Sequence, residues 1–244
     1  MLFGTDHLIV SPKDDRASVE WMNVDLLRGA LDYIQNNQQK FLDALRLHVE
    51  LSLYALLFGI LLFVPLGILA SRWRGGPALV GFVSALRVIP SIAVLFLLYP
   101  YRRDIGQLIP FWDRNFVLAL IALTLLAGPP LIINTDAALR GVSPSVMENA
   151  RGLGMTGPQV FSKVQLPLAL PVITGGVRTA AVEVIASATF AAFIGVGTLG
   201  KFITSGLTLY DFSLLLVGAV PVTLLALGAE ASLAGFQRLV STPA

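Results

Sequence analysis

The sequence predicts an all-α membrane protein. Apolar residues (Ala, Val, Ile, Leu, Met, Phe, Trp, Tyr and Cys) form 55% of the 244 residues, charged residues form only 13%, and the mean hydropathy is +0.77. A soluble domain carries about 25% charged residues. Five apolar runs each approach the ~20 residues that a helix needs to cross a bilayer. Because lipid cannot satisfy open backbone groups, we expect these runs to be helices.

The N-terminal segment differs from the rest of the chain because its first 50 residues hold 13 of the 32 charges. It lacks the basic and then apolar pattern of a signal peptide. Apolar residues recur at helical spacing from about 24 to 49, interrupted by polar Asn36 to Gln39. We therefore expect a lead-in helix with a loop in it, the alternative being a solvated polar tail. We therefore divide the chain into an N-terminal segment over residues 1–48 and a membrane domain over residues 49–240.

The predicted spans differ in the charges that they contain. They cover residues 51–70, 78–98, 116–133, 169–194 and 212–235. The first and third contain no charge, and the others contain Arg87, Arg178 with Glu183, and Glu230. An unpaired charge at mid-bilayer costs at least about 2.5 kcal/mol, so each needs a partner or a polar path.

Depth along the spans indicates which of these charges can pair. Arg87 and Arg178 each lie about nine residues from the same side of the bilayer, and Glu230 lies about six from it, which makes Glu230 a candidate partner for either arginine. Arg178 and Glu183 lie about 140° apart around one helix and are not expected to pair. Two roles are possible for the residues of this group: they form structural ion pairs, or they line a translocation path. The group consists of Arg87, Pro90, Ser91, Arg178, Glu183 and Glu230.

Several kinds of chemistry are not expected in this chain. Cysteine is absent, and His7 and His48 lie 41 residues apart without a carboxylate at ligand spacing, so we expect no metal site. Neither G-x-x-x-x-G-K-[ST] nor G-x-S-x-G occurs, so we expect neither ATP hydrolysis nor a serine nucleophile. No basic run is available for nucleic acid. No residue is assigned a catalytic role.

The connection from 134 to 168 is the longest between predicted spans, and it carries helix signals. Ser143 followed by proline is a start signal, with a glycine stop at 152 or 154. Thr156-Gly157-Pro158 starts a second short helix, which Leu166-Pro167 is expected to end before the fourth span. Two short helices at a glycine corner indicate a docking surface, the alternative being a structured connector.

Seven residues of this connection have a distinctive spacing. They are Glu148, Asn149, Ala150, Gly154, Val164, Leu166 and Pro167. The pattern resembles the EAA motif of bacterial ABC-importer permeases, in which Glu-Ala-Ala is followed after three residues by Gly and after nine more by Ile-x-Leu-Pro. Every spacing agrees, and the departures are Asn149 in place of Ala and Val164 in place of Ile.

Other stretches resemble one branch of that family, the permeases for the osmoprotectants glycine betaine, choline and carnitine. They are 64–68, 89–91, 153–157, 176–179, 193–195 with 199–200, and 218–223. The resemblance implies a five-helix type I importer permease fold, similar to that of the methionine importer, in the cytoplasmic (inner) membrane. It also implies that 134–168 is a cytoplasmic coupling loop, with the N-terminus outside and the C-terminus inside. Lys and Arg number nine outside and six inside in this orientation, against the positive-inside rule.

The resemblance also implies partners. They are a pair of ATPase subunits that bind ATP and Mg²⁺, a second permease subunit (identical or homologous), an extracytoplasmic solute-binding protein and the bilayer. No cofactor is expected in this chain. The function implied is osmoprotectant import, and the alternatives are import of another small solute (ergothioneine, methionine or another amino-acid derivative) and a non-ABC channel or scaffold.

Overall fold

The computed structural model describes residues 25–89, 91–108 and 112–240, and the regular elements within these ranges are all helical. Residues 25–36 form a helix at the start of the described chain. The elements that follow are α2 (Gln38–Arg72), α3 (Gly76–Ala85), η1 (Leu86–Val88), α4 (Ser91–Leu98), η2 (Tyr99–Tyr101), α5 (Arg102–Leu108), α6 (Arg114–Arg140), α7 (Pro144–Gly152), α8 (Gly157–Val160), η3 (Phe161–Gln165), α9 (Leu166–Ser187), η4 (Ala188–Ile194), α10 (Gly200–Leu209) and α11 (Phe212–Val240). The prediction of an all-helical protein with several long apolar helices is confirmed.

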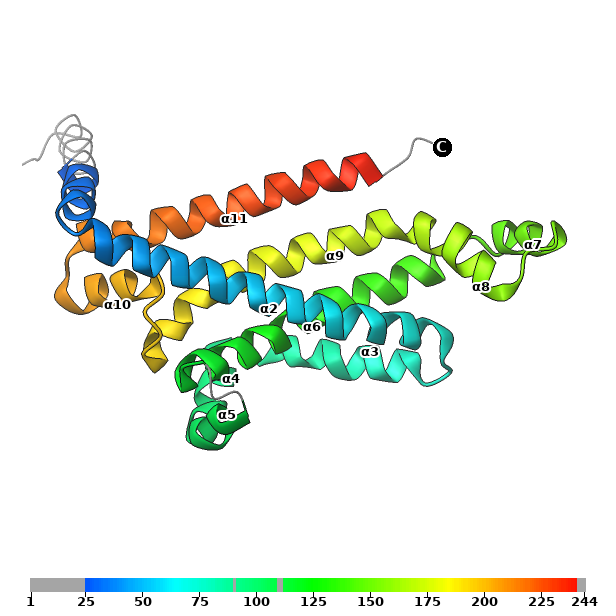
Figure 1. The fold of residues 1–244 in the computed structure, drawn as a ribbon, viewed down its shortest axis with the longest axis horizontal. Coiled ribbons are helices and arrows are strands. Elements are labelled where there is room, and N and C mark those ends of the chain that lie inside the picture. Colours follow the sequence, from blue (N-terminus) through cyan, green and yellow to red (C-terminus); the bar gives the residue numbers. More distant parts are fainter. Residues whose placement is uncertain (1–24, 90, 109–111, 241–244) are drawn as a thin grey trace, which may run out of the picture.

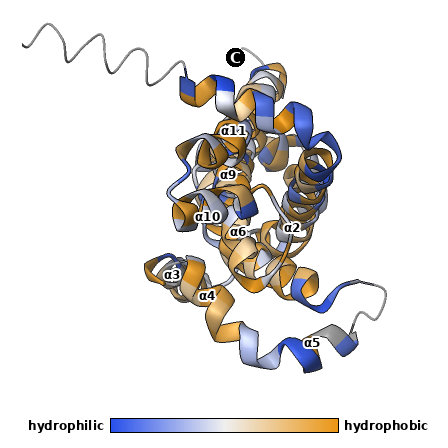
Figure 2. Ribbon diagram, turned by 90° about the vertical axis from the view of Figure 1, so that its left-hand side faces the viewer, coloured by the Kyte–Doolittle hydropathy of each residue, from blue (hydrophilic) through white to orange (hydrophobic). Residues whose placement is uncertain are grey.

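Helix α6 forms the centre of an elongated bundle (Figures 1 and 2). Its most apolar window is 72% buried, compared with 28% for α2 and 22% for α11. Small residues bring its neighbours close, because a Cβ added to Gly59 of α2 would lie 2.9 Å from Ala127, and one added to Gly176 of α9 would lie 2.6 Å from Asn134. Close backbone approach at small residues is how membrane helices gain packing contacts without a hydrophobic driving force.

The long helices give the bundle two distinct ends (Figure 1). Helices α2, α6 and α11 run towards the end that carries α7, whereas α3 with α4, and α9, run in the opposite direction. The turn between α2 and α3, the segment from α6 to α9 and the end of α11 therefore lie at one end, called the α7 end. The helix over 25–36, α5 and α10 lie at the other, called the α10 end.

Helix α2 begins earlier than the first predicted span. The predicted loop over 36–39 is only a turn at Asn37, because the amide of Asn37 donates to the Tyr33 carbonyl at 2.9 Å and the amide of Phe41 donates to the Asn37 carbonyl at 3.1 Å. The 35 residues of α2 measure about 52 Å at 1.5 Å per residue, which exceeds the ~30 Å hydrocarbon thickness. Part of α2 therefore extends beyond the hydrocarbon.

The span predicted over 78–98 consists of two short helices with a break between them. Helix α3 ends at Ala85, a 3₁₀ turn follows, and α4 begins at Ser91. Within the described residues, four helices are long and apolar enough to cross a membrane, and α3 is a shorter apolar helix. Pro90 lies outside the described residues, but a proline disfavours helical backbone at the residue before it, here Ile89. The α3–α4 pair still returns the chain from the α7 end towards the α10 end (Figure 1).

Two predicted loops contain helices, and one span is longer than predicted. Residues 99–115 include α5, residues 195–211 include α10, and α6 continues to Arg140 where the third span was expected to end at 133. The connection that follows α6 therefore starts at Gly141. These differences leave the order of the long helices unchanged.

Candidate coupling loop and intramembrane charges

Helix α7 and the corner that follows it define the geometry of the candidate coupling loop. The helix begins at Pro144 after Ser143, as predicted, and ends at Gly152. Gly154 has φ +84°, its amide donates to the Arg151 carbonyl at 2.9 Å, and the Met155 amide donates to the Ala150 carbonyl at 3.2 Å. This pair of bonds is a Schellman motif with glycine in the left-handed position. A Cβ at 154 would have no atom within 4 Å, so the backbone conformation alone requires glycine.

The second loop helix starts where expected but does not stop. The Thr156 amide receives a reciprocal cap, because it donates to Gln159 Oε1 at 2.8 Å. The predicted stop at Leu166-Pro167 is wrong, since the π-helical turn η3 joins α8 to α9 and the Leu166 amide donates to the Phe161 carbonyl five residues back. The wide turn accommodates Pro167, which has no N–H and whose ring would clash with a carbonyl in a regular α-helix. Residues 157–194 form a continuous 38-residue helical segment.

The loop is fixed to the bundle by contacts that the sequence analysis missed. Arg140 Nη2 donates to the carbonyl of Ala70 in α2 at 2.7 Å, and Gln165 Nε2 donates to a carbonyl near the end of α6 at 3.0 Å. The guanidinium of Arg72 lies 4.0 Å from the centre of the Phe161 ring. The π-turn is therefore held against the ends of α2 and α6. A basic residue in the last turn of each of these helices was the only sequence signal.

The motif residues divide into an outward and an inward set. Glu148, Asn149, Gly154 and Pro167 are exposed, Val164 and Leu166 are half-buried, and Ala150 is buried. Helix α7 thus packs through Ala150 and presents Glu148 and Asn149 to the outside. A cleft lies between this loop and α2, lined by Arg72, Met147, Arg151, Phe161 and Gln165 among others.

Arg178 and Glu230 form an ion pair between α9 and α11. Arg178 Nη2 donates to Glu230 Oε1 at 2.5 Å, and Arg178 Nη1 donates to Gln237 Oε1 at 2.8 Å. Gln237 Nε2 donates to the Pro171 carbonyl at 2.8 Å, which fixes the orientation of its amide. Charge-assisted hydrogen bonds of this kind are about twice as strong as neutral ones. This is one of the two pairings that depth along the spans left open for Glu230.

The other intramembrane charges are less tightly held. Arg87 lies in the exposed η1 turn, and its charge interacts with that of Glu183 on α9 without a hydrogen bond between them. Ser91 begins α4, after the break, and Pro90 lies outside the described residues. Glu183 and Glu230 line the same groove between α9 and α11, together with Thr179. The structure thus brings Glu183 near the Arg178–Glu230 pair, and it places Arg87 near Glu183.

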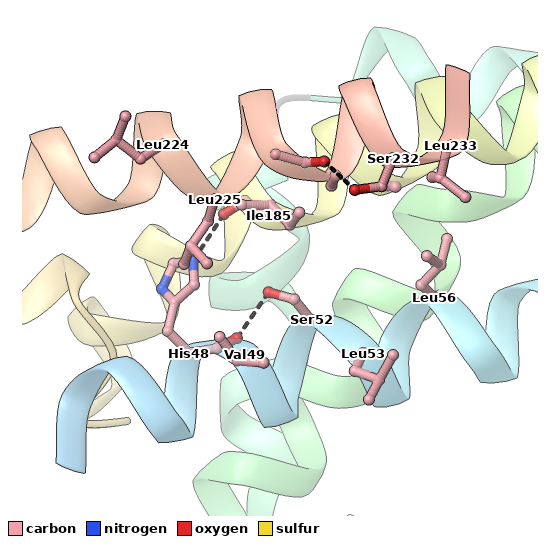
Figure 3. Close-up of a pocket in the computed structure, with 13 residues that line it drawn as sticks. His48, Val49, Ser52, Leu53, Leu56, Ile185, Leu224, Leu225, Ser232 and Leu233 are labelled. Carbon is pink, nitrogen blue, oxygen red and sulfur yellow. Dashed lines mark hydrogen bonds between the residues drawn. The ribbon is translucent and has the colours of Figure 1, made fainter. Parts of the chain in front are cut away.

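His48 connects α2 to α9. The sequence analysis considered His48 only as a metal ligand and did not predict this contact. It is fully buried, and Nε2 lies 3.0 Å from the Ile185 carbonyl, which can only accept, so Nε2 carries the proton (Figure 3). Ser52 donates to the His48 carbonyl at 2.8 Å. These residues lie at an apolar pocket between α2, α9 and α11. Within the part of the chain that the structure describes, no group of three or more acidic or histidine side chains is placed to hold a metal ion.

Comparisons with known proteins agree with this architecture. The family model described as "Binding-protein-dependent transport system inner membrane component" matches residues 54–242. The glycine betaine/carnitine/choline transport system permease protein OpuCB of Bacillus subtilis is 36% identical over 86% of this chain and 93% of its own length. The carnitine transport permease protein OpuCB of Listeria monocytogenes is 40% identical over 82% and 88% respectively.

A solved structure shows the same fold. The structure entitled "Inward facing conformations of the MetNI methionine ABC transporter" superposes with a TM-score of 0.72 at 20% identity, covering 84% of this chain and 98% of that chain. At this identity the similarity concerns the fold alone. The family match over most of the chain and the relatives at 36–40% identity show that the chain belongs to the inner membrane permease components of binding-protein-dependent ABC importers, in the osmoprotectant branch.

Proposed function

We propose that this chain is one of two permease subunits through which a small quaternary ammonium osmoprotectant, such as glycine betaine, choline or carnitine, enters the cell. The relatives that share 36–40% of its residues are named for these solutes. The observation that carries the transport role is the loop with Gly154 at φ +84°, which sets α7 at a fixed angle to the α8–α9 helix.

The α7 end is proposed to face the cytoplasm, with the N-terminus outside and the C-terminus inside. ATP is available only in the cytoplasm, so a loop that docks on an ATPase must lie there. The turn between α2 and α3 and the end of α11 lie at that same end (Figure 1). Six Lys and Arg then lie inside and nine outside. The positive-inside rule opposes this orientation, so the docking loop is the stronger argument for it.

The energy for transport is proposed to come from a separate pair of ATPase subunits that bind ATP and Mg²⁺. Glu148 and Asn149 are exposed on α7 and available to contact such a subunit, while Ala150 packs inward. An extracytoplasmic binding protein would deliver the solute at the α10 end. No cofactor is proposed for this chain itself.

A second permease subunit is proposed to cover the groove between α9 and α11. Glu183 is only half-buried and makes no hydrogen bond among the described residues, and Thr179 beside it is exposed. Hydrocarbon would leave the carboxylate without a hydrogen-bond donor, at a cost of a few kcal/mol. A facing subunit with water between the two would solvate it, which places the Arg178–Glu230 pair beside a path for solute.

The decisive experiment is uptake by a reconstituted importer. Proteoliposomes that contain the permease, its ATPase and its binding protein should accumulate labelled glycine betaine, choline or carnitine only when ATP is supplied on the side of the α7 end. Labelled methionine and ergothioneine serve as comparison solutes. Uptake of either of these, with none of the three quaternary ammonium solutes transported, would overturn the proposed substrate class.

A further inference from the structure

A cleft at the α10 end takes no part in the coupling loop or the ion pairs. It is bounded by α2, by the start of α6 and by the turn over 195–197. Its volume is about 480 Å³, within the range of about 300–1,000 Å³ found for small-molecule sites. We call it the ring cleft, because three aromatic side chains form its wall.

Trp112 packs against both other rings, and all three residues line the cleft. Tyr54 and Trp112 are stacked with ring centres 5.3 Å apart and planes at 29°, and Phe116 meets Trp112 edge to face at 5.4 Å. Tyr54 and Trp112 are half-buried. Aromatic faces carry negative partial charge and attract cations, most strongly at tryptophan. The cation–π contacts found among the described residues involve other rings, so no Lys or Arg there occupies these faces.

The charges around the ring cleft favour a cation with an attached anionic group. Arg46, Glu50 and Asp113 all line it, and Arg46 Nε lies 2.7 Å from Glu50 Oε1. These three groups sum to one negative charge. Arg46 is 79% exposed, so its guanidinium can also reach a carboxylate on a bound solute. Asp113 Oδ1 accepts the amides of Asn115 and Phe116 and is thereby fixed at the start of α6.

In the turn over 195–197, which bounds the cleft on the third side, Val196 is the only residue with a side chain. Gly195 has φ +87°, a conformation that other residues rarely adopt, and Gly197 follows two positions later. A Cβ at either position would meet nothing closer than 3.4 Å. The two glycines therefore add no side chain to the cleft, which leaves room for a group the size of a methylated ammonium.

We propose that the ring cleft is a low-affinity subsite for the trimethylammonium group of a small quaternary ammonium solute. The identity of this solute rests on the proposed function. The rings take the methylated cation, which cannot donate hydrogen bonds and loses little hydration on an aromatic surface. Asp113 supplies the fixed negative charge. Arg46 receives the carboxylate when the solute is a zwitterion such as carnitine. Weak binding suits a position through which the solute must pass.

The test uses the fluorescence of Trp112. The chain has three tryptophans, Trp21, Trp73 and Trp112, so Trp21→Phe and Trp73→Phe leave Trp112 as the single reporter in the full-length permease. The purified protein in detergent is titrated with choline chloride and with carnitine. The emission of Trp112 should change saturably, with half-saturation above about 1 mM. Sodium chloride and 3,3-dimethylbutanol, the uncharged isostere of choline, should produce no such change.

Variants separate binding from folding. Asp113→Asn removes the charge but retains an oxygen that can cap α6, and it should weaken the choline response at least 5-fold with thermal stability unchanged. Tyr54→Leu should abolish the response. Tyr99→Leu is the matched control, because Tyr99 lies beneath Arg102 and outside the cleft, and it should leave the response intact.

The outcomes distinguish this subsite from the proposed function. An equal response to 3,3-dimethylbutanol, or a choline response that survives both Asp113→Asn and Tyr54→Leu, overturns the subsite. If the reconstituted importer transports choline or carnitine while Trp112 gives no specific response, the subsite is wrong and the proposed function stands. A specific response in an importer that transports neither solute supports the subsite and counts against the proposed function.

Discussion

Arg178 and Glu230 meet 2.5 Å apart across α9 and α11, and Gln237 holds the other side of the guanidinium at 2.8 Å. The contact joins two spans through residues that are 52 positions apart in the sequence. Gln237 adds a second polar attachment of α11 to α9 there, because its Nε2 donates to the Pro171 carbonyl at 2.8 Å. The pair is therefore a test of what keeps α11 in place.

Removing one member of this pair should destabilise the fold more than removing both. Arg178→Leu and Glu230→Leu should each cost about 1.5–3 kcal/mol, because a charged hydrogen-bond partner is left unpaired in the membrane. The double variant should recover part of the folded yield, measured by thermal unfolding and size-exclusion chromatography in detergent. Arg238→Leu removes an exposed charge from the same helix and should be neutral. Simple additivity of the two single effects would mean that the residues are not coupled.

Gly154→Val should separate folding from transport. A β-branched residue at φ +84° is strained by about 1–3 kcal/mol, and relief of that strain changes the angle between α7 and α8. We expect normal membrane insertion but loss of solute uptake and of substrate-stimulated ATP hydrolysis. Gly152→Val is the matched control, since a Cβ there also meets nothing within 4 Å but φ is not positive. Uptake at the wild-type rate by Gly154→Val would exclude the corner as the coupling element.

Glu148→Lys probes the docking face of the same loop. Glu148 is exposed on α7, so its replacement should not disturb the permease fold. A reversed charge should weaken attachment of the ATPase, because hydrogen bonds to a charged group contribute about 1.5–3 kcal/mol. Copurification of the ATPase with the variant should fall, together with uptake. Unchanged copurification and unchanged uptake would show that this face is not the contact.

Cysteine labelling tests the orientation. The chain has no native cysteine, and Ser145 in α7 and Ser205 in α10 are exposed at opposite ends of the bundle. An impermeant thiol reagent should label Ser205→Cys in intact cells and Ser145→Cys only after permeabilisation. The reverse pattern would favour the orientation that the Lys and Arg count predicts.

The packing of α9 against α6 at Gly176 can be tested by substitution, with Gly228 of α11 as the control position. A Cβ at 176 would lie 2.6 Å from the Asn134 Cβ and 2.9 Å from the Pro130 carbonyl oxygen, whereas a Cβ at Gly228 would meet nothing within 4 Å. Overpacking of this kind costs about 1–3 kcal/mol. Gly176→Val should therefore lower the midpoint of thermal unfolding in detergent, and Gly228→Val should not. Equal effects would mean that α6 and α9 separate easily at this point.

Local sequence patterns predicted the parts of the structure that depend on local chemistry. Run length and composition identify the long apolar helices, and the Ser143-Pro144 start of α7 follows from capping preferences. Helix α10 was missed because Gly200 and Gly206 weigh against a helix. In the structure they allow close packing, since a Cβ would lie 2.0 Å from the Thr189 carbonyl oxygen or 2.5 Å from the Leu215 amide nitrogen. Tertiary packing there overrides helix propensity.

Long-range contacts were beyond prediction unless charge restricted the choice. Depth along the spans and the cost of a buried charge limited the partner of Glu230 to Arg87 or Arg178, and the structure shows Arg178. Nothing comparable marks Tyr54 and Trp112, which are 58 residues apart and stack only because α2 and the start of α6 meet. The contact of Gln165 with the end of α6 is equally invisible, because a glutamine is compatible with most exposed positions. The candidate roles of the motif residues in coupling remain predictions.

The π-turn before Leu166 joins α8 and α9 into one continuous helical segment. The sharp corner before this segment is at Gly154, and the contacts of Phe161 with Arg72 and of Gln165 with the end of α6 hold the π-turn against the bundle. Arg178 lies 21 residues beyond Gly157, a distance of about 32 Å along a straight helix. For a rigid rod of that length, each degree of tilt at the corner displaces Arg178 by about 0.6 Å. A rotation of only 10° at the corner would thus carry the end of the rod about 6 Å sideways, so the ion pair of Arg178 with Glu230 ties movement of the loop to the position of α11.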